Sequence, residues 1–178
     1  MKLPIRCDKT LSKVCATKKD LRDCLQSPWL ENGNLYATNG HIVARIPVET
    51  EPGETNGEVK MDAITAAAKL APKGDKPQVI ANGNLQVPNG PEFPRSTEIK
   101  YPNVTRIFEE TTEREHDLTV TFNADLLSRL SAAIRKDGKP GGVRLKFKND
   151  PNAPILVETF TGNSGECDAI GILMPMQG

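Results

Sequence analysis

The pattern of apolar and polar positions predicts three segments in which a strand is followed by a helix and then by further strands. In the last segment, residues 116–122 alternate between apolar and polar side chains, which is the period of a half-buried strand. A helix with Asn123 as its N-cap is predicted next, because apolar residues then recur at helical spacing (Leu126, Leu127, Leu130 and Ile134). The segments 142–148, 153–160 and 169–174 predict three further strands.

The middle segment repeats this order. Residues 57–61 predict a short strand, Asp62 is expected to cap the helix that follows, and Pro72 is expected to end it. The turn at 73–77 resembles the turn at 136–140, with an offset of 63 residues that becomes 64 after one inserted glycine. A hairpin through Asn82 and Gly83 and a strand over 96–100 complete this copy.

A third, more degraded copy opens the chain. It is predicted as a strand over 3–7, a helix somewhere within 8–25, and a hairpin of 34–38 with 41–47 that turns at Asn39 and Gly40. The polar segments 49–57 and 109–116 separate the copies and predict linkers or exposed loops. We therefore expect an α+β fold of three half-domain repeats, with sheets on one side and helices on the other.

The amino-acid composition argues against several classes of protein. The chain has 178 residues, of which 37% are hydrophobic, and its 23 basic residues balance 23 acidic ones. This argues against a disordered tail and against a globally basic nucleic-acid binder. The sequence has no apolar run for a membrane span and no signal-peptide pattern at its start, which predicts a cytoplasmic protein. Cys7, Cys15, Cys24 and Cys167 lack metal-site spacing and are interpreted as reduced thiols.

The residues needed for catalysis are scarce. The chain has two histidines, His41 and His116, and none of the usual motifs of metalloproteases, serine hydrolases or phosphate-binding loops. We predict that the protein is not an enzyme and that it binds no cofactor and no metal.

Three segments together resemble the bacterial DNA sliding clamp family, the beta subunit of DNA polymerase III. Residues 22–25 with 35–44, which contain the run Ala-Thr-Asn-Gly-His, resemble a pattern of the clamp's middle domain. Residues 101–107 resemble the end of that domain, and residues 122–127 with the Leu-Met-Pro-Met of 173–176 resemble the last domain. The resemblance implies a DNA clamp (processivity) fold, because the segments occur in the family's order and coincide with the repeats.

The family fold also implies a division of the chain. Residues 1–108 correspond to both halves of the middle domain (about 1–54 and 55–108), 109–115 to a linker, and 116–178 to the second half of the last domain. A clamp chain has six halves and a dimeric ring twelve, so four chains of three halves would again supply twelve. A homotetrameric ring is therefore a hypothesis.

The resemblance places the family's pocket for partner peptides between the middle and last domains. It assigns to this pocket a set of mostly apolar residues: Leu25, Thr38, Gly40, His41, Ile42, Val43, Pro102, Ile107, Ile172, Met174, Pro175 and Met176. Three positions depart from the family pattern, since Ile42 replaces an Arg, Asn39 an Asp and Gln177 a basic residue. For the terminal Met-Pro-Met, burial in the protein's own core is an equal alternative.

Basic residues on the predicted helices are candidates for contact with a DNA backbone without sequence readout: Lys13, Lys18, Lys19, Lys69, Arg129, Arg135 and Lys136. An ordinary solvated surface is the alternative for these residues.

Two functions stay open at this stage. The first is a sliding-clamp-like processivity factor that binds short hydrophobic motifs of a DNA polymerase or other replication and repair proteins, and encircles or lies along duplex DNA. The second is a compact clamp mimic, a peptide-binding module that never surrounds DNA.

Overall fold

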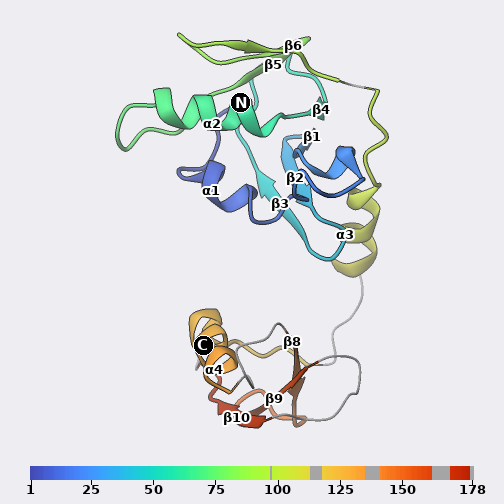
Figure 1. Ribbon diagram of the computed structural model, residues 1–178, viewed down its shortest axis with the longest axis vertical. Helices are drawn as coiled ribbons and strands as arrows, with labels where there is room; N and C mark the ends of the chain where they lie inside the picture. Colours follow the sequence, from blue (N-terminus) through green and yellow to red (C-terminus); the bar gives the residue numbers. More distant parts are fainter. Residues whose placement is uncertain (97, 113–117, 135–140, 162–168, 177–178) are drawn as a thin grey trace. The chain divides into compact units, whose positions relative to one another are not determined.

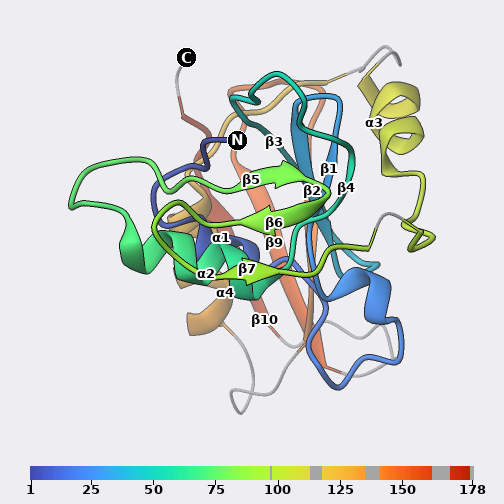
Figure 2. The ribbon, with the colours of Figure 1, turned by 90° about the horizontal axis from the view of Figure 1, so that it is seen from above.

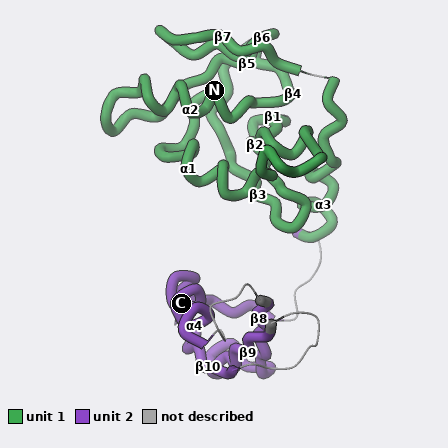
Figure 3. Tube along the Cα trace, in the orientation of Figure 1, with its two compact units in different colours: residues 1–111 green, residues 112–178 purple. Residues whose placement is uncertain are grey.

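The computed structural model describes residues 1–96, 98–112, 118–134, 141–161 and 169–176. The chain divides into two compact units, Met1–Thr111 and Thr112–Gly178 (Figures 1 and 3). Both units combine antiparallel β-structure with short α-helices, which confirms the predicted α+β class.

The first unit contains two antiparallel sheets. In chain order its elements are α1 (Cys7–Leu11), the 3-10 helix η1 (Asp23–Leu25), β1 (Trp29–Glu31), β2 (Asn34–Thr38), β3 (Val43–Pro47), β4 (Gly57–Glu58), α2 (Met61–Leu70), β5 (Ile80–Asn82), β6 (Asn84–Gln86), β7 (Glu92–Phe93) and α3 (Val104–Thr112). The strand orders are β3-β2-β1-β4 and β5-β6-β7. Figure 2 shows β5, β6 and β7 side by side, with α2 next to them.

One hydrophobic core joins the two halves of this unit. It contains residues of α1 and α2, which pack against each other, together with residues of both sheets. Leu3, Leu35, Ile64, Val79 and Leu85 are fully buried in it. Burial of this apolar surface is the main force that holds the short strands in place.

The described residues of the second unit form one helix and one antiparallel sheet. Its elements are α4 (Ala124–Ala133), β8 (Gly141–Lys146), β9 (Ile155–Thr161) and β10 (Ala169–Leu173), with strand order β10-β9-β8. The Asn123 side chain accepts hydrogen bonds from the backbone N–H groups of Asp125 and Leu126, so its predicted capping role is confirmed. Ile155, Val157 and Leu173 form the small buried core under α4.

Several predicted elements are also confirmed. The hairpin of β2 and β3 turns at Asn39 and Gly40, and that of β5 and β6 turns at Gly83. The helix α2 ends before Pro72, because Ala71 already has an extended backbone, as expected for a residue that precedes proline.

The predicted strand over 3–7 is wrong. Lys2 forms isolated bridges to Glu49 and Gln78, but the Cys7 N–H then bonds to the Pro4 carbonyl at 3.1 Å and the chain turns into α1. Proline has no N–H for a ladder, and this stops the strand. The helix expected within 8–25 is reduced to α1 and η1.

Two further predicted strands and one predicted helix cap differ from the structure. The strand predicted over 57–61 covers only Gly57–Glu58, because Lys60 is already the N-cap of α2. Asp62 lies in the first turn of this helix and does not cap it, although its charge there favours the helix dipole. No described residue of 96–100 is in a strand, since Pro94 follows β7 and cannot continue its ladder.

The strand predicted to reach Phe122 is also absent from the described residues 118–122. Its alternation is nevertheless real, because Val120 and Phe122 pack against the core while Thr119 and Thr121 are exposed. The segment has one cross-strand bond, from the Met176 N–H to the Thr121 carbonyl at 2.7 Å. One cross-strand hydrogen bond is too few to form a β-ladder.

Candidate functional site

An open pocket of about 440 Å³ lies in the first unit, between η1, the turn after β2 and the start of α3. Two of its residues, Leu25 and Val104, are almost fully buried and form the floor. Two others, Ile42 and Ile107, are each 52% exposed and stand at the rim. The complete lining is Arg22, Cys24, Leu25, Thr38, Gly40, His41, Ile42, Val43, Pro102, Val104 and Ile107.

The turn between β2 and β3 is held by side chains of its own residues. The Thr38 hydroxyl donates to the Ile42 carbonyl at 2.6 Å and accepts from the Gly40 N–H at 3.0 Å. The Asn39 side-chain oxygen accepts from the N–H groups of His41 at 2.9 Å and Ile42 at 3.1 Å. These bonds fix the rim of the pocket before any ligand arrives, which lowers the entropy cost of binding.

Arg22 lies against this turn. Its guanidinium donates to both oxygens of Asp20, at 3.0 and 2.9 Å, and to the Asn39 carbonyl at 3.1 Å. Gly40 permits this contact because its φ is 86° and a Cβ there would lie 2.4 Å from Arg22 Nη1. The bonds from Arg22 lower the pKa of Asp20 from 3.8 to about 2.

Aromatic side chains attach the α3 side of the pocket to the larger sheet. Tyr101 stacks on Trp29 of β1, with ring centroids 5.4 Å apart, and Phe108 contacts Tyr36 of β2 at 5.9 Å. The Tyr101 hydroxyl donates to the Tyr36 carbonyl at 3.3 Å, and burial raises the pKa of Tyr101. These contacts place Val104 and Ile107 opposite η1.

The Arg45 guanidinium lies 5.0 Å from the centre of the Phe108 ring, and the Thr105 hydroxyl donates to Glu31 Oε2 at 2.7 Å. Both contacts join α3 to the sheet, so the helix is attached through polar as well as apolar groups.

The structure brings together all eight pocket residues that the sequence analysis assigned within the first unit. They are Leu25, Thr38, Gly40, His41, Ile42, Val43, Pro102 and Ile107. Sequence reasoning missed Arg22, Cys24 and Val104. Each of these three belongs to a segment that carried the resemblance, 22–25 or 101–107, and that was the available signal. A binding role for the eight stays a prediction.

The other four predicted pocket residues lie in the second unit. Ile172 in β10 is 66% exposed, and Met174 and Met176 beyond the strand are also exposed. Pro175 between the two methionines is half-buried. Within the second unit, Ile172, Met174 and Met176 therefore present apolar side chains at the surface, whereas Leu173 is buried in the core.

The candidate DNA-contacting residues are exposed wherever the structure describes them: Lys13, Lys18, Lys19, Lys69 and Arg129. Lys69 and Arg129 lie on α2 and α4, but Lys13, Lys18 and Lys19 follow the end of α1 at Leu11 and lie outside helices, contrary to prediction. Arg135 and Lys136 fall outside the described residues.

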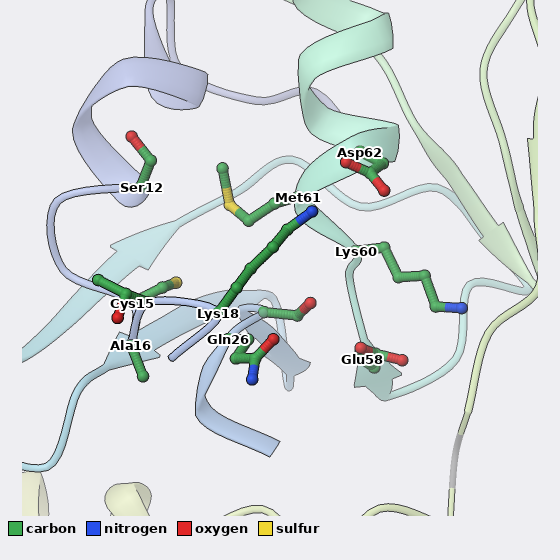
Figure 4. Close-up of a pocket in the computed structure, with 11 residues that line it drawn as sticks. Ser12, Cys15, Ala16, Lys18, Gln26, Glu58, Lys60, Met61 and Asp62 are labelled. Carbon is green, nitrogen blue, oxygen red and sulfur yellow. The ribbon is translucent and has the colours of Figure 1, made fainter. Parts of the chain in front are cut away.

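A second hollow of about 350 Å³ lies near the start of α2 (Figure 4). Lys18 and Lys60 face it together with Glu58 and Asp62, so that charges of both signs line it. This balance favours neither an anion nor a cation.

Cys7, Cys15 and Cys24 are free thiols, while Cys167 is not among the described residues. Burial raises the pKa values of Cys7 and Cys15 to about 11, which keeps both thiols protonated and unreactive at neutral pH. In the described part of the chain, no group of His, Cys, Asp and Glu is arranged to hold a metal ion. Nor does any described helix have the length and apolar character to cross a membrane.

Comparison with solved structures identifies the fold as that of a DNA sliding clamp. The chain matches the beta subunit from the DNA polymerase of Streptococcus pyogenes with a TM-score of 0.64 and 15% sequence identity. The match covers 96% of this chain and 48% of that one, so the chain spans about half the length of the protein it matches. No family model and no curated protein match the sequence. The clamp fold expected from the resemblance is thus confirmed.

Proposed function

We propose that this protein is a non-enzymatic, sliding-clamp-like protein that binds short hydrophobic motifs of a DNA polymerase or of other replication and repair proteins. The observation that carries the proposal is the pocket of the first unit, where eight residues from separate segments, assigned by the family resemblance, line one hollow. Assembled around duplex DNA as a homo-oligomer, the protein would serve as a processivity factor.

The chemistry of the pocket supports a peptide ligand. A floor of Leu25 and Val104 suits an apolar anchor side chain, and the half-exposed Ile42 and Ile107 add apolar surface at the rim. His41 and Thr38 supply polar groups beside it. In the family pattern an Arg stands at position 42, so Ile42 makes this rim less positive and favours a more apolar peptide.

Direct binding measurements test the pocket. The probes are fluorescein-labelled peptides of about ten residues with two adjacent large apolar side chains, and a matched set carries serine at those two positions. We expect saturable binding of the apolar set, and His41→Ala to weaken it by about 1–3 kcal/mol. Deletion of residues 174–178 should weaken binding to a similar extent if the second unit contributes.

A charged substitution at the rim supplies the sharpest control. Ile107→Glu places a carboxylate in the pocket, whereas Ile5→Glu makes the same change at a residue that is 56% exposed and outside this pocket. We expect the first to abolish peptide binding and the second to leave it unchanged, with both variants folded by circular dichroism. Equal affinities for the two variants would remove the pocket from the proposal.

The second candidate function, a peptide-binding module that does not encircle DNA, is favoured by the balanced charge of the chain. The two functions differ in topology. A closed ring is retained on circular duplex DNA and slides off after linearisation, whereas a module that does not encircle DNA shows no such difference. Retention that is lost on cutting the circle supports the clamp, and equal binding to both forms supports the module.

A further inference from the structure

The helices α2 and α4 are equivalent elements of two repeats. Both have ten residues, and each α4 position carries the number of its α2 counterpart plus 63. Ala63 and Ile64 of α2 thus correspond to Leu126 and Leu127 of α4, and both α2 residues are fully buried. Leu126, in contrast, is 46% exposed, although it is larger and more apolar than Ala63.

The first unit shows what buries such a helix. There α2 packs against α1 of the other half, and sixteen buried residues from both halves share one core. In the second unit, three buried residues form the core among those that the structure describes. Within the first unit, α2 therefore has a complementary half beside it. Among the described residues of the second unit, no second helix packs on the apolar face of α4.

The sheet of the second unit also leaves apolar side chains exposed. Val143 of β8 lies on the same side of its strand as Leu145, which packs against the core under α4, yet Val143 is 37% exposed. Phe147, two residues beyond Leu145, is also exposed. A three-stranded sheet with one helix buries little apolar surface, so covering this side would add to its stability.

Charges on α4 indicate which partner fits. Asp125, Leu126 and Arg129 fall within about 100° of the helix circumference, on a face away from the core. Among the described residues, neither the Asp125 carboxylate nor the Arg129 guanidinium has an ion-pair partner. If a second α4 lay antiparallel with a twofold axis near Leu127, each Asp125 would face the Arg129 of the other copy, and the two Leu126 side chains would meet between them.

We propose that the second unit associates with the second unit of another copy of this chain, through an antiparallel pair of α4 helices. The contact is isologous: Leu126 is its apolar centre, and two Asp125–Arg129 pairs flank it. Each half thereby gains the kind of complementary half that α2 already has within the first unit. The contact does not involve the peptide pocket, so a result that contradicts one of the two proposals leaves the other unaffected.

The first test is the molar mass of the full chain, measured by light scattering and by sedimentation equilibrium over a range of concentrations. We expect a dimer, and we expect Leu126→Glu to raise its dissociation constant at least about tenfold because the substitution enters the contact twice. Leu21→Glu is the matched control, since Leu21 is 99% exposed in the first unit. A wild-type chain that stays monomeric, or a dimer that Leu126→Glu does not weaken, would overturn the proposal.

The second test exploits the symmetry of the contact. Asp125→Arg gives a helix with two basic groups on this face, and Arg129→Asp gives one with two acidic groups. Each variant alone should dimerise less well than the wild type, but an equimolar mixture should form a heterodimer in which both ion pairs are restored. Circular dichroism controls for folding of each variant.

A mixture that associates no better than the separate variants would show that α4 does not meet α4 in this register. That result would favour a different partner surface, such as the first unit of another copy, and would contradict the proposal even if Leu126→Glu still weakened the dimer.

Discussion

At the scale of single residues, the geometry of the pocket rim depends on Gly40. A side chain at this position would be opposed twice, by the positive φ and by the guanidinium of Arg22. Gly74 has a similar φ of 97°, but no atom lies within 4 Å of the place that a Cβ would occupy there, so its substitution isolates the cost of the backbone conformation. Substitutions at the two glycines therefore distinguish the cost of backbone strain from the cost of steric contact with Arg22.

We expect Gly74→Ala to lower the free energy of unfolding by about 1–2 kcal/mol, the cost of a left-handed alanine. Gly40→Ala should cost more and should also weaken binding of the apolar peptides, because Arg22 and the turn must move apart. Urea unfolding and fluorescence polarisation measure the two effects. If both variants bound peptide as well as the wild type, Arg22 would have no part in shaping the rim.

Asp20 provides a pH test of the same contact. Its pKa in the folded protein is lowered from 3.8 to about 2, chiefly by hydrogen bonds from Arg22. Because the folded value is the lower one, the stabilisation is fully present above about pH 4 and is lost as the pH falls toward 2. We expect the Asp20 carboxyl signal in NMR spectra to titrate near pH 2, and Arg22→Ala to return its midpoint toward 3.8. An unchanged midpoint in that variant would refute the assigned cause.

At the scale of elements, the last turn of α3 is a feature that the sequence pattern did not predict. The acidic, polar run that begins at residue 109 predicted a linker or exposed loop, yet residues 109–112 are the last turn of a helix. The helix is held by aromatic contacts from Tyr101 and Phe108 to a sheet far away in sequence. Local polarity cannot reveal contacts of this kind, and tertiary packing overrides it.

Elements with a clear period were predictable. The alternation in β8, β9 and β10 and the apolar stripe of α4 gave the right element types, and Asn123 gave the right cap. Errors concentrated where proline or a helix N-terminus interrupts a short apolar run, as at Pro4, Lys60 and Pro94. At Pro4 and Pro94, the missing N–H of proline stops the strand, and at Lys60 the start of α2 stops it.

The pocket could be predicted only in part and by a different route. The periodicity of apolar residues does not predict that η1, the turn after β2 and the start of α3 lie together. The family resemblance of their segments does predict it. It failed to single out Arg22, Cys24 and Val104, which line the same hollow, because the individual roles within a matched segment are visible only once the chain is folded.

The attachment of α3 to the sheet makes a further prediction. Tyr101→Ala removes the stack on Trp29 and should lower the free energy of unfolding by about 2–4 kcal/mol, while loosening the side of the pocket that carries Ile107. Tyr101→Phe keeps the ring and loses one long hydrogen bond, so it should cost less than about 1 kcal/mol. Trp29 is the only tryptophan in the chain, and its fluorescence reports the contact directly. Similar losses for both variants would mean that the hydroxyl matters more than the stack.

At the scale of the whole molecule, the balance of 23 basic and 23 acidic residues sets the character of any DNA contact. A chain without net charge has no general attraction for DNA, so the proposed DNA binding would have to come from local groups and from enclosure. Weak, salt-sensitive contacts suffice for a protein that is retained by topology, whereas a protein that grips DNA needs more of them. The exposed lysines on and after the helices of the first unit are the candidates for such contacts.

Two of these lysines allow a quantitative prediction. Replacing Lys13 and Lys69 with Gln removes two charges from the α1 and α2 region, and if both contact phosphates, the slope of log K against log salt should fall in magnitude by about 2. Fluorescence anisotropy of a labelled duplex over a range of salt concentrations measures the slope. The control pair is Lys100→Gln with Lys148→Gln, which removes the same charge at exposed positions outside the predicted set. If both pairs changed the slope equally, the attraction would come from overall charge and not from these two positions, and the assignment of Lys13 and Lys69 would be wrong.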